Sequence, residues 1–472
     1  MKTKPKLKTI QAKGYRNLEM ATPFQLDNLN ILIGANGAGK SNLLEMIEFL
    51  PDALSNGLTE TFKKRRGFSS VINLDRELPS EMQLEWKLSG SSHLTQGIDL
   101  KYQLIIEGDN HGRFEVTQEI LNFAAPRSPN ELTSYKHLDF KYGDGTVMPS
   151  NGAQNVPENL KSAQKLALGT LSSPQVYPVL ESVRDQALSW RFYNANDMNV
   201  HAIKRESKEI DALQKTLAPD GCNLGMVLYN LIQSEEGDFG ENLDRILRSL
   251  YNGHRSIRFP LVDSMHFELS WQFDNPRKPL KLDQMSDGTI RMLCWIAVLA
   301  DPNPPALVCI DEPELGIHPA WLPILATLIS EAAEHTQVII STHSSILLDE
   351  FSLQADKVIV WDGNNWGQSK IKLQYAFSRR IFSTRSTTSP YHQHFFKPLI
   401  FQHTNARPSP QTRANSTISP HISPPPPPSQ VGWDGILSVC ATKNVTQPNN
   451  HKLGYVITQH SICLPNLPGY LV

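Results

Sequence analysis

One eight-residue segment near the start of the chain constrains its fold more than any other feature. Residues Gly34–Ser41 read Gly-Ala-Asn-Gly-Ala-Gly-Lys-Ser, the G-x-x-x-x-G-K-[ST] pattern of a phosphate-binding loop. The apolar, β-branched run Leu29–Ile33 precedes it, and the helically spaced run Asn42–Leu50 follows it. A strand, a glycine-rich loop and a helix in this order predict an α/β P-loop fold.

The residue types of this loop explain how it would hold a nucleoside triphosphate. Glycines let successive backbone N–H groups turn toward phosphate oxygens, and the helix N-terminus adds partial positive charge. The Lys40 amine would reach the β- and γ-phosphates of ATP, and the Ser41 hydroxyl would be a ligand of Mg²⁺. The expected nucleotide-binding residues are Gly34, Ala35, Asn36, Gly37, Ala38, Gly39, Lys40, Ser41 and Asn42.

A second apolar strand is predicted at Ala306–Ile310, and two carboxylates follow it directly. Paired acids at the end of a buried strand are costly to desolvate unless a cation or a proton transfer uses them. We expect Asp311 to hold Mg²⁺, directly or through water. Glu312 would then orient and deprotonate the attacking water. A surface turn with two acids is the alternative interpretation.

Two further segments carry candidate phosphate contacts. His343 follows the predicted strand Gln337–Ile340, and its separation of about thirty residues from the carboxylates suits a parallel β-α-β return toward the γ-phosphate. Ser286 and Gly288 stand at the start of a predicted helix over 287–299, where a γ-phosphate can also bind. The alternatives are a structural histidine and a simple helix cap.

Together these motifs resemble the ATP-binding cassette class of P-loop ATPases, and within it the non-transporter RecF- and SMC-like branch with its OLD-type and AAA_21-like groups. The resemblance covers roughly residues 1–365. The segments that carry it are Gly14–Leu18, Gly34–Asn42, Leu217–Leu224, Ser286–Arg291, Asp311–Pro319 and Ser341–Ser344.

The resemblance implies a role for each segment. Ser286–Thr289 would be the signature motif, Glu314–His318 the D-loop and His343 the switch histidine. In this class the signature of one subunit completes the phosphate site of another, so ATP would clamp two heads into a homodimer and hydrolysis would release them. The Q-loop glutamine is not placed, and Gln83 is a candidate for it. The implied catalytic residues are Glu312, His343 and Lys40.

The predicted organisation is an ABC-type head with insertions. Residues 1–55 and 281–365 would form the ATPase lobe, and residues 56–280 would hold an antiparallel β subdomain and an inserted helical region. Within this region three short runs alternate between apolar and polar residues, as strands of a half-exposed sheet do, and the segment 176–250 has helical spacing. The three alternating runs are residues 82–88, 98–106 and 113–117.

Two segments carry little periodicity. Residues 123–165 are rich in Pro, Asn, Ser and Gly, and we expect loops there. Residues 366–472 are rich in Ser, Thr, Pro and His and include five consecutive prolines, so we expect a disordered tail. The alternatives for the tail are a basic arm that contacts nucleic acid or a partner, and a readthrough or frame-shifted extension.

Charge and cysteine content restrict the partners. The formal net charge is −2, but the charges are unevenly distributed. From Gly363 onward the chain has ten Lys and Arg and one acidic residue, Asp434, so the preceding part has a net charge of about −11. This argues against a broad basic DNA-binding face on the ATPase. A single acid in the tail also cannot supply the carboxylate cluster of an OLD-type nuclease, so we expect no nuclease activity.

Localisation follows from the same kind of evidence. The five scattered cysteines indicate free thiols in a reducing compartment rather than a zinc site. The basic start leads to no apolar signal-peptide region, and no run of about 18 apolar residues could cross a membrane. We therefore expect a cytoplasmic protein without a membrane partner.

The leading functional hypothesis is an ATP-driven dimerisation switch that acts on DNA or a DNA-bound partner in repair, maintenance or defence. One alternative is a switch that controls a separately encoded effector protein without DNA. Another is the nucleotide-binding subunit of a transporter. The transporter is disfavoured by the Gly-Tyr-Arg-Asn start, by the long insertion before the signature and by the missing Q-loop.

Overall fold

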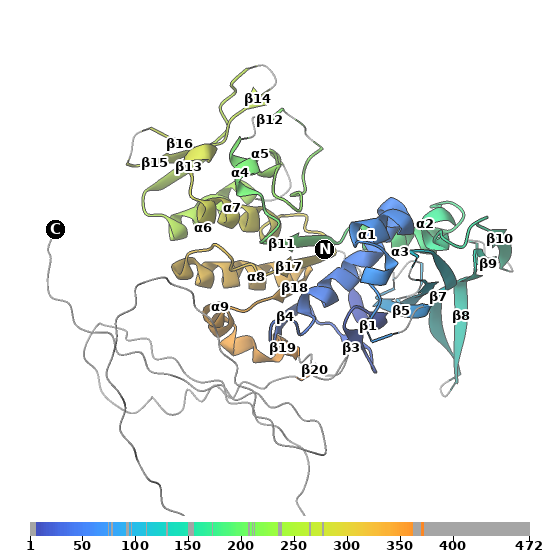
Figure 1. Ribbon diagram of the computed structural model, residues 1–472. Coiled ribbons are helices and arrows are strands. Elements are labelled where there is room, and N and C mark those ends of the chain that lie inside the picture. The colour runs from blue at the N-terminus through green and yellow to red at the C-terminus, as the bar shows by residue number, and fades with distance from the viewer. Residues whose placement is uncertain are drawn as a thin grey trace, which may run out of the picture. The chain divides into compact units, whose positions relative to one another are not determined.

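The computed structural model contains two large sheets, one mainly parallel and one antiparallel (Figure 1). It describes residues 6–73, 75–76, 79–90, 94–95, 97–109, 111–128, 131–149, 155–171, 173–205, 208–209, 211, 213–234, 238–263, 266–275, 278–361 and 370–371. The tail predicted over 366–472 therefore lies outside the described residues, apart from Lys370 and Ile371.

The six-stranded sheet carries the motifs predicted for the ATPase lobe. Its first five strands are parallel, and the last pairs antiparallel at one edge. In spatial order the strands are β11 (Arg191–Asn194), β17 (Leu307–Asp311), β18 (Gln337–Ser341), β4 (Leu29–Ile33), β19 (Val358–Trp361) and β20 (Lys370–Ile371). Helix α8 (Leu322–His335) connects β17 to the parallel strand β18, which confirms the predicted β-α-β return.

Both faces of this sheet are buried, so alternate residues of a strand enter different cores. On β17, Leu307 and Cys309 face the core that includes α1 (Lys40–Lys64) and the antiparallel sheet. Val308 and Ile310 face the second core, which contains α5 (Leu224–Gln233), α6 (Phe239–Leu250), α7 (Asp287–Leu299) and α8. Burial on both faces explains why these strands read as continuous apolar runs in the sequence.

The antiparallel sheet covers the first core and confirms the three alternating runs as β5, β6 and β7. Every second residue of these strands faces the core, as in a sheet with one solvated face. In spatial order the strands are β10 (Val156–Asn159), β9 (Asp144–Val147), β8 (Glu131–Lys141), β7 (Phe114–Ser128), β6 (Leu100–Gly108), β5 (Ser80–Leu88), β1 (Leu7–Tyr15) and β2 (Leu18–Glu19), with β3 (Phe24–Gln25) also paired to β1.

Loops predicted over 123–165 are wrong, because β7 continues to Ser128 and three more strands follow. Among the side chains described there, the buried apolar ones are few: Leu138 and Phe140 on β8, Val147 on β9 and Leu160 after β10. Polar residues occupy most of the other positions, so the alternation of apolar and polar residues that predicts a strand is weak there.

The helical prediction over 176–250 is confirmed at four places and wrong at two. Helices α3 (Pro178–Leu188), α4 (Val200–Arg205), α5 (Leu224–Gln233) and α6 (Phe239–Leu250) occupy it, but β11 joins the parallel sheet and β12 (Lys208–Glu209) pairs with β14 (His266–Phe267). Strands of two to four residues are too short to show a period of their own. No helix within the described ranges is both long and apolar enough to cross a membrane.

The remaining elements are short, except for the predicted helix over 287–299, which is confirmed as α7. They are α2 (Ala167–Leu171), α4 (Val200–Arg205), α7 (Asp287–Leu299), α9 (Ser345–Glu350), the pair β12 (Lys208–Glu209) and β14 (His266–Phe267), and the three-stranded sheet β13 (His254–Arg258), β15 (Ser270–Phe273) and β16 (Leu280–Lys281).

Candidate functional site

Three neighbouring strands bring the predicted motifs to one edge of the parallel sheet. Strand β18 lies between β4 and β17, with Asp311 opposite Ser341 and Ser341 opposite Leu32. Since all three strands are parallel, their carboxyl ends share this edge. The phosphate loop follows β4, the Asp311–Glu312 pair ends β17, and His343 follows β18, so segments far apart in sequence meet here.

The phosphate loop has the backbone that its glycines permit. Gly37 and Gly39 have φ angles of 78° and 95°, in the left-handed region that side chains disfavour. Gly39 is the N-cap of α1 and gives the helix no side-chain cap, so its first N–H groups are available to an anion. A Cβ on Gly39 would lie 2.6 Å from Asn17 Oδ1, so a side chain there would displace the Asn17 amide.

Lys40 lies folded over this loop. Its Nζ donates to the carbonyl oxygens of Gly34 at 2.9 Å and Ala35 at 3.1 Å, and the residue is 5% exposed. Burial lowers the pKa of the ammonium, while the negative charges of Asp311 and Glu312 act in the opposite direction. A buried ammonium beside free helix N–H groups fits phosphate oxygens.

The Asp311 carboxylate is held from two sides. Its Oδ1 accepts a hydrogen bond from the Ser341 hydroxyl, and its Oδ2 lies 3.4 Å from Asn194 Nδ2. With the exposed Ser41 hydroxyl it offers two oxygen ligands, the kind that Mg²⁺ prefers alongside phosphate and water. The described residues contain no group of three or more His, Cys, Asp or Glu that could hold a metal without such help.

Glu312 has an unusual backbone for a residue with a side chain. Its φ is 54°, and its N–H donates to Ser341 O at 3.0 Å across to β18. Its Oε1 lies 3.8 Å from His343 Nε2, and its Oε2 lies 3.3 Å from Asn196 Nδ2. Backbone strain of this kind often accompanies function, because the surrounding structure has to hold it in place.

Asn194 and Asn196 are absent from the predicted site, yet both amides contact its carboxylates. Asn194 ends β11 in register with Asp311, and Asn196 follows it. The signal available in the sequence was a short apolar stretch, Phe192-Tyr193, followed by two polar amides. The predicted Q-loop candidate Gln83 instead lies in β5, between Lys13 and Ile105 of the antiparallel sheet.

Ser286 and Gly288 lie on α7. Ser286 is the N-cap of this helix, and its hydroxyl accepts from Thr289 N at 3.2 Å and lies 2.6 Å from Thr289 Oγ1. A Cβ on Gly288 would lie 2.7 Å from Gly316 O in the loop after β17. Within the described part of the chain no hydrogen bond or ion pair joins Ser286 or Gly288 to the phosphate loop, and Ser286 is exposed.

Asn17 connects the first strands to the phosphate loop. Its Nδ2 donates to Gly37 O at 3.2 Å, and its Oδ1 accepts from Asn42 Nδ2 at 2.8 Å. The Asn42 side chain therefore holds Asn17, which in turn holds the phosphate loop of the same chain. The preceding residue, Arg16, makes two 2.7 Å contacts with the Glu45 carboxylate on α1.

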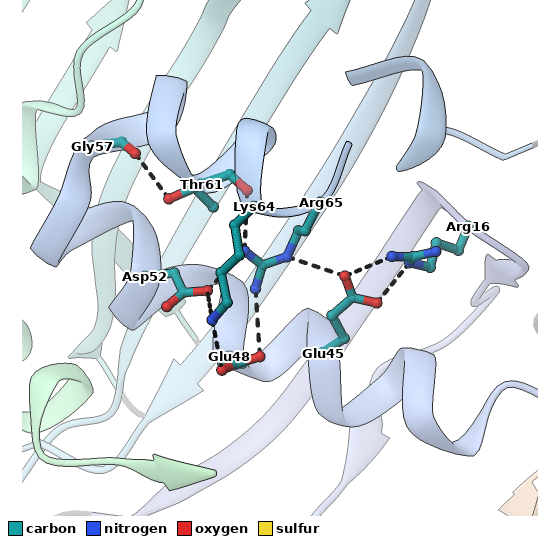
Figure 2. A network of polar contacts seen from close by, with 8 residues as sticks. All are labelled: Arg16, Glu45, Glu48, Asp52, Gly57, Thr61, Lys64 and Arg65. Atoms are coloured by element: carbon teal, nitrogen blue, oxygen red, sulfur yellow. Dashed lines mark hydrogen bonds and ion pairs between the residues drawn. The ribbon is translucent and has the colours of Figure 1, made fainter. Parts of the chain in front are cut away.

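A network of ion pairs continues from Glu45 along α1 (Figure 2). The helix is interrupted at Gly57, with φ 78° and ψ 159°, and the chain beyond it brings Arg65 back onto the first half. The Arg65 side chain is 3% exposed and lies 3.2 Å from Glu45 and 2.8 Å from Asp52. This network fixes the helix that begins at the phosphate loop.

Comparisons with known proteins agree with the motifs. The family described as "AAA domain, putative AbiEii toxin, Type IV TA system", AAA_21, matches residues 29–349, about two thirds of the chain. A 106-residue segment is 37% identical to the DNA replication and repair protein RecF of Lactococcus lactis subsp. lactis (strain IL1403). That segment covers 22% of this chain and 25% of the RecF protein, so the chain spans about a quarter of this relative.

Solved structures with a similar course of the chain include SMC head domains. One is the SmcHead bound to the C-winged helix domain of ScpA, at 15% identity and a TM-score of 0.48 over 76% of this chain and 96% of that one. Another is the head domain from Thermotoga maritima, at 14% identity and a TM-score of 0.37 over 73% and 92%. The family match, together with the motifs that meet at one sheet edge, identifies the chain as a member of the AAA_21 family and a RecF/SMC-like P-loop ATPase.

Proposed function

We propose that the protein binds ATP with Mg²⁺ and hydrolyses it at the carboxyl edge of the parallel sheet. The observation that carries this proposal is the meeting of the phosphate loop, the Asp311–Glu312 pair and His343 on three adjacent parallel strands. Lys40 binds the β- and γ-phosphates, and Ser41 and Asp311 hold Mg²⁺, which neutralises phosphate charge when bound.

Glu312 acts as the general base in this proposal. Its carboxylate takes a proton from the attacking water, whose oxygen bonds to the γ-phosphorus of ATP. The bond between the γ-phosphorus and the β–γ bridging oxygen breaks, and ADP and phosphate leave. His343, whose ring lies 3.8 Å from Glu312, contacts the γ-phosphate and keeps the two groups aligned. Asn196 orients the other oxygen of Glu312.

The proposal includes ATP-dependent dimerisation of two heads. The side chains of Glu312 and His343 are 32% and 37% exposed in the single chain, although phosphoryl transfer benefits from exclusion of water. Ser286 is exposed as well, on a helix N-terminus that suits a γ-phosphate. A partner's Ser286 and Gly288 would cover the site, which matches the role implied for a signature motif.

The proposed target is DNA or a DNA-bound partner. The support is the similarity to RecF, whose name assigns it to DNA replication and repair. Two lysines on strands of the antiparallel sheet pair with carboxylates: Lys101 lies 2.8 Å from Glu85, and Lys87 lies 3.3 Å from Asp99. We therefore expect DNA to contact a small part of the surface. Binding to DNA should be weak at high salt, and the clearer effect of DNA should be on the rate of ATP hydrolysis.

Control of a separate protein effector is the second candidate function. The family description, which names a toxin of a toxin–antitoxin system, favours it. In this case ATP would switch a protein complex, and DNA would leave the rate of hydrolysis unchanged.

Steady-state ATP hydrolysis, with and without single- and double-stranded DNA at a fixed salt concentration, tests the proposal. Glu312→Gln should retain ATP, lose about 10²–10⁴-fold in kcat and accumulate as a dimer in ATP. Lys40→Ala should lose tight ATP binding. The matched control is Glu334→Gln, which changes an exposed carboxyl on α8.

Each result separates the parts of the proposal. Stimulation by DNA that disappears in Glu312→Gln would support the DNA-directed switch. Hydrolysis indifferent to DNA would favour the protein effector. A Glu312→Gln protein that stays monomeric with ATP bound would refute the dimer, and undiminished ATP binding by Lys40→Ala would show that the loop is not the site.

A further inference from the structure

Glu314 lies in the loop after β17, and its carboxylate contacts the loop that carries His343. Its Oε1 accepts from the Thr342 hydroxyl at 2.8 Å, from the His343 N–H at 2.9 Å and from the Ser344 N–H at 3.1 Å. One charged oxygen therefore fixes three consecutive residues after β18. Hydrogen bonds to an ionised acceptor are stronger than those between neutral groups.

The loop that holds Glu314 is anchored on both sides. The Leu315 N–H donates to Glu312 O at 3.0 Å, which closes a turn around the residue. Trp295 Nε1 on α7 donates to Pro313 O at 2.9 Å, and Trp295 is fully buried. These two hydrogen bonds fix the backbone on both sides of Glu314, and with it the place from which its side chain extends.

The imidazole of His343 has much less to hold it. Its Nε2 lies 3.8 Å from Glu312 Oε1, beyond hydrogen-bond distance, and the side chain is 37% exposed. No hydrogen bond to the ring is found among the described residues. The direction of the ring therefore depends on the backbone that Glu314 fixes.

Capping of the short helix α9 does not account for Glu314. Ser344 already caps this helix, because its hydroxyl accepts from Leu347 N at 3.1 Å. Glu314 Oε2 is buried without a hydrogen-bond partner among the described residues, a costly arrangement for a structural acceptor. A function for the charged side chain would explain why this cost is tolerated.

We propose that Glu314 is a positioning residue for His343. It holds the backbone of the switch loop so that the imidazole faces Glu312 and the γ-phosphate of bound ATP. The inference rests on the proposed ATP hydrolysis and adds to it a residue that acts through His343 alone. It predicts that Glu314 matters for turnover but not for ATP binding.

The test is a double-mutant cycle on the full chain with Mg²⁺ and saturating ATP. Glu314→Ala should lower kcat about 30-fold or more with KM changed less than about twofold. Glu314→Ala in a His343→Ala background should cause no further loss, because its effect passes through the missing ring. Glu314→Gln, which keeps an oxygen acceptor but loses the charge, should recover part of the activity, and Glu334→Ala on α8 is the control.

Two results would overturn the inference while the proposed function stands: wild-type kcat in Glu314→Ala, or a full further loss in the double variant. Absence of hydrolysis by the wild-type chain would instead refute the proposed function, and the inference with it. If Glu314→Ala fails to fold, Thr342→Val replaces it, since this change removes one of the three bonds. It should lower kcat by a smaller factor and have no effect beside His343→Ala.

Discussion

Asn196 Nδ2 lies 3.3 Å from Glu312 Oε2, although 116 positions separate the two residues in the sequence. The contact depends on β11, whose pairing with β17 carries the Asn194–Asn196 segment to the end of the carboxylate strand. The neutral amide of Asn196 can donate a hydrogen bond to the Glu312 carboxylate without exchanging a proton with it. The contact is therefore suited to orient Glu312.

Substitution of Asn196 should impair turnover. Asn196→Ala removes the donor, and we expect kcat to fall about tenfold, with ATP binding unchanged because the phosphate loop is intact. Asn196→Asp places a like charge beside Glu312 and should lower kcat further. Steady-state kinetics and nucleotide titration of both variants measure this. The control is Asn242→Asp on α6; equal kinetics in all three variants would contradict an orienting role.

Gly288→Ala should separate the start of α7 from the loop that carries Gly316. The new Cβ would lie 2.7 Å from Gly316 O, so one segment has to move. We expect a loss of about 1–3 kcal/mol in the free energy of unfolding and weaker ATP-dependent dimerisation, with ATP still bound. Gly240→Ala on α6 is the control, because its nearest neighbour would be Ile232 Cγ2 at 3.8 Å. Similar stabilities of the two variants would refute the steric argument.

Arg65→Met should destabilise the fold by removing the centre of the network on α1. Glu45 and Asp52 would lose a partner that is 3% exposed, and breaking a buried ion pair costs about 3–5 kcal/mol. Lys64 still pairs with Asp52 at 2.9 Å, so we expect the lower end of this range or less. Chemical denaturation measures the change. Lys63→Met, whose side chain is 67% exposed, should shift stability by less than about 0.5 kcal/mol.

Two buried groups of the antiparallel sheet, Glu119 and His137, should affect the free energy of unfolding with opposite dependences on pH. Burial raises the pKa of Glu119 to about 7, although hydrogen bonds from Leu168 and Ala167 oppose the shift. Its contribution to stability is present below the unfolded pKa and falls as pH rises toward 7. Burial lowers the pKa of His137 to about 4, so its contribution rises with pH between about 4 and 6.5.

Single substitutions should reveal this compensation. Each shift corresponds to about 3 kcal/mol, with opposite sign, so the unfolding free energy of the wild type should change little over this range on account of these two groups. Glu119→Gln leaves the effect of His137, so stability should rise with pH between about 4 and 6.5. His137→Phe leaves the effect of Glu119, so stability should fall between about pH 4.5 and 7. Denaturation at several pH values checks both. Parallel profiles for the two variants would contradict the assignment.

The sequence predicted the parts of the molecule that are regular and buried. β4, β17 and β18 are buried on both faces, and α7 runs over the predicted residues, so their apolar patterns are long enough to read. β4, β17 and β18 lead into the phosphate loop, the Asp311–Glu312 pair and His343. Motif spacing together with parallel topology was therefore sufficient to bring them together.

The rest depended on tertiary pairing that a local pattern does not encode. β3 and β4 are close in sequence but belong to different sheets, and Asn30 on β4 bonds to both backbone groups of Asp27 in the turn between them. The role of Glu314 likewise appears only when the loops after β17 and β18 lie side by side. Contacts between loops follow from strand order, which single-sequence periodicity does not give.

The position of β18 between β4 and β17 has a consequence for how this site can vary. Neighbouring strands are about 4.8 Å apart, so the phosphate loop and the carboxylate pair stand on strands about 10 Å from each other. Main-chain hydrogen bonds set this gap, and Ser341 to His343 fill its middle. Side-chain substitutions can change which groups contact a ligand between the phosphate loop and the carboxylates. The distance between these two segments stays the same as long as the sheet keeps its strand order.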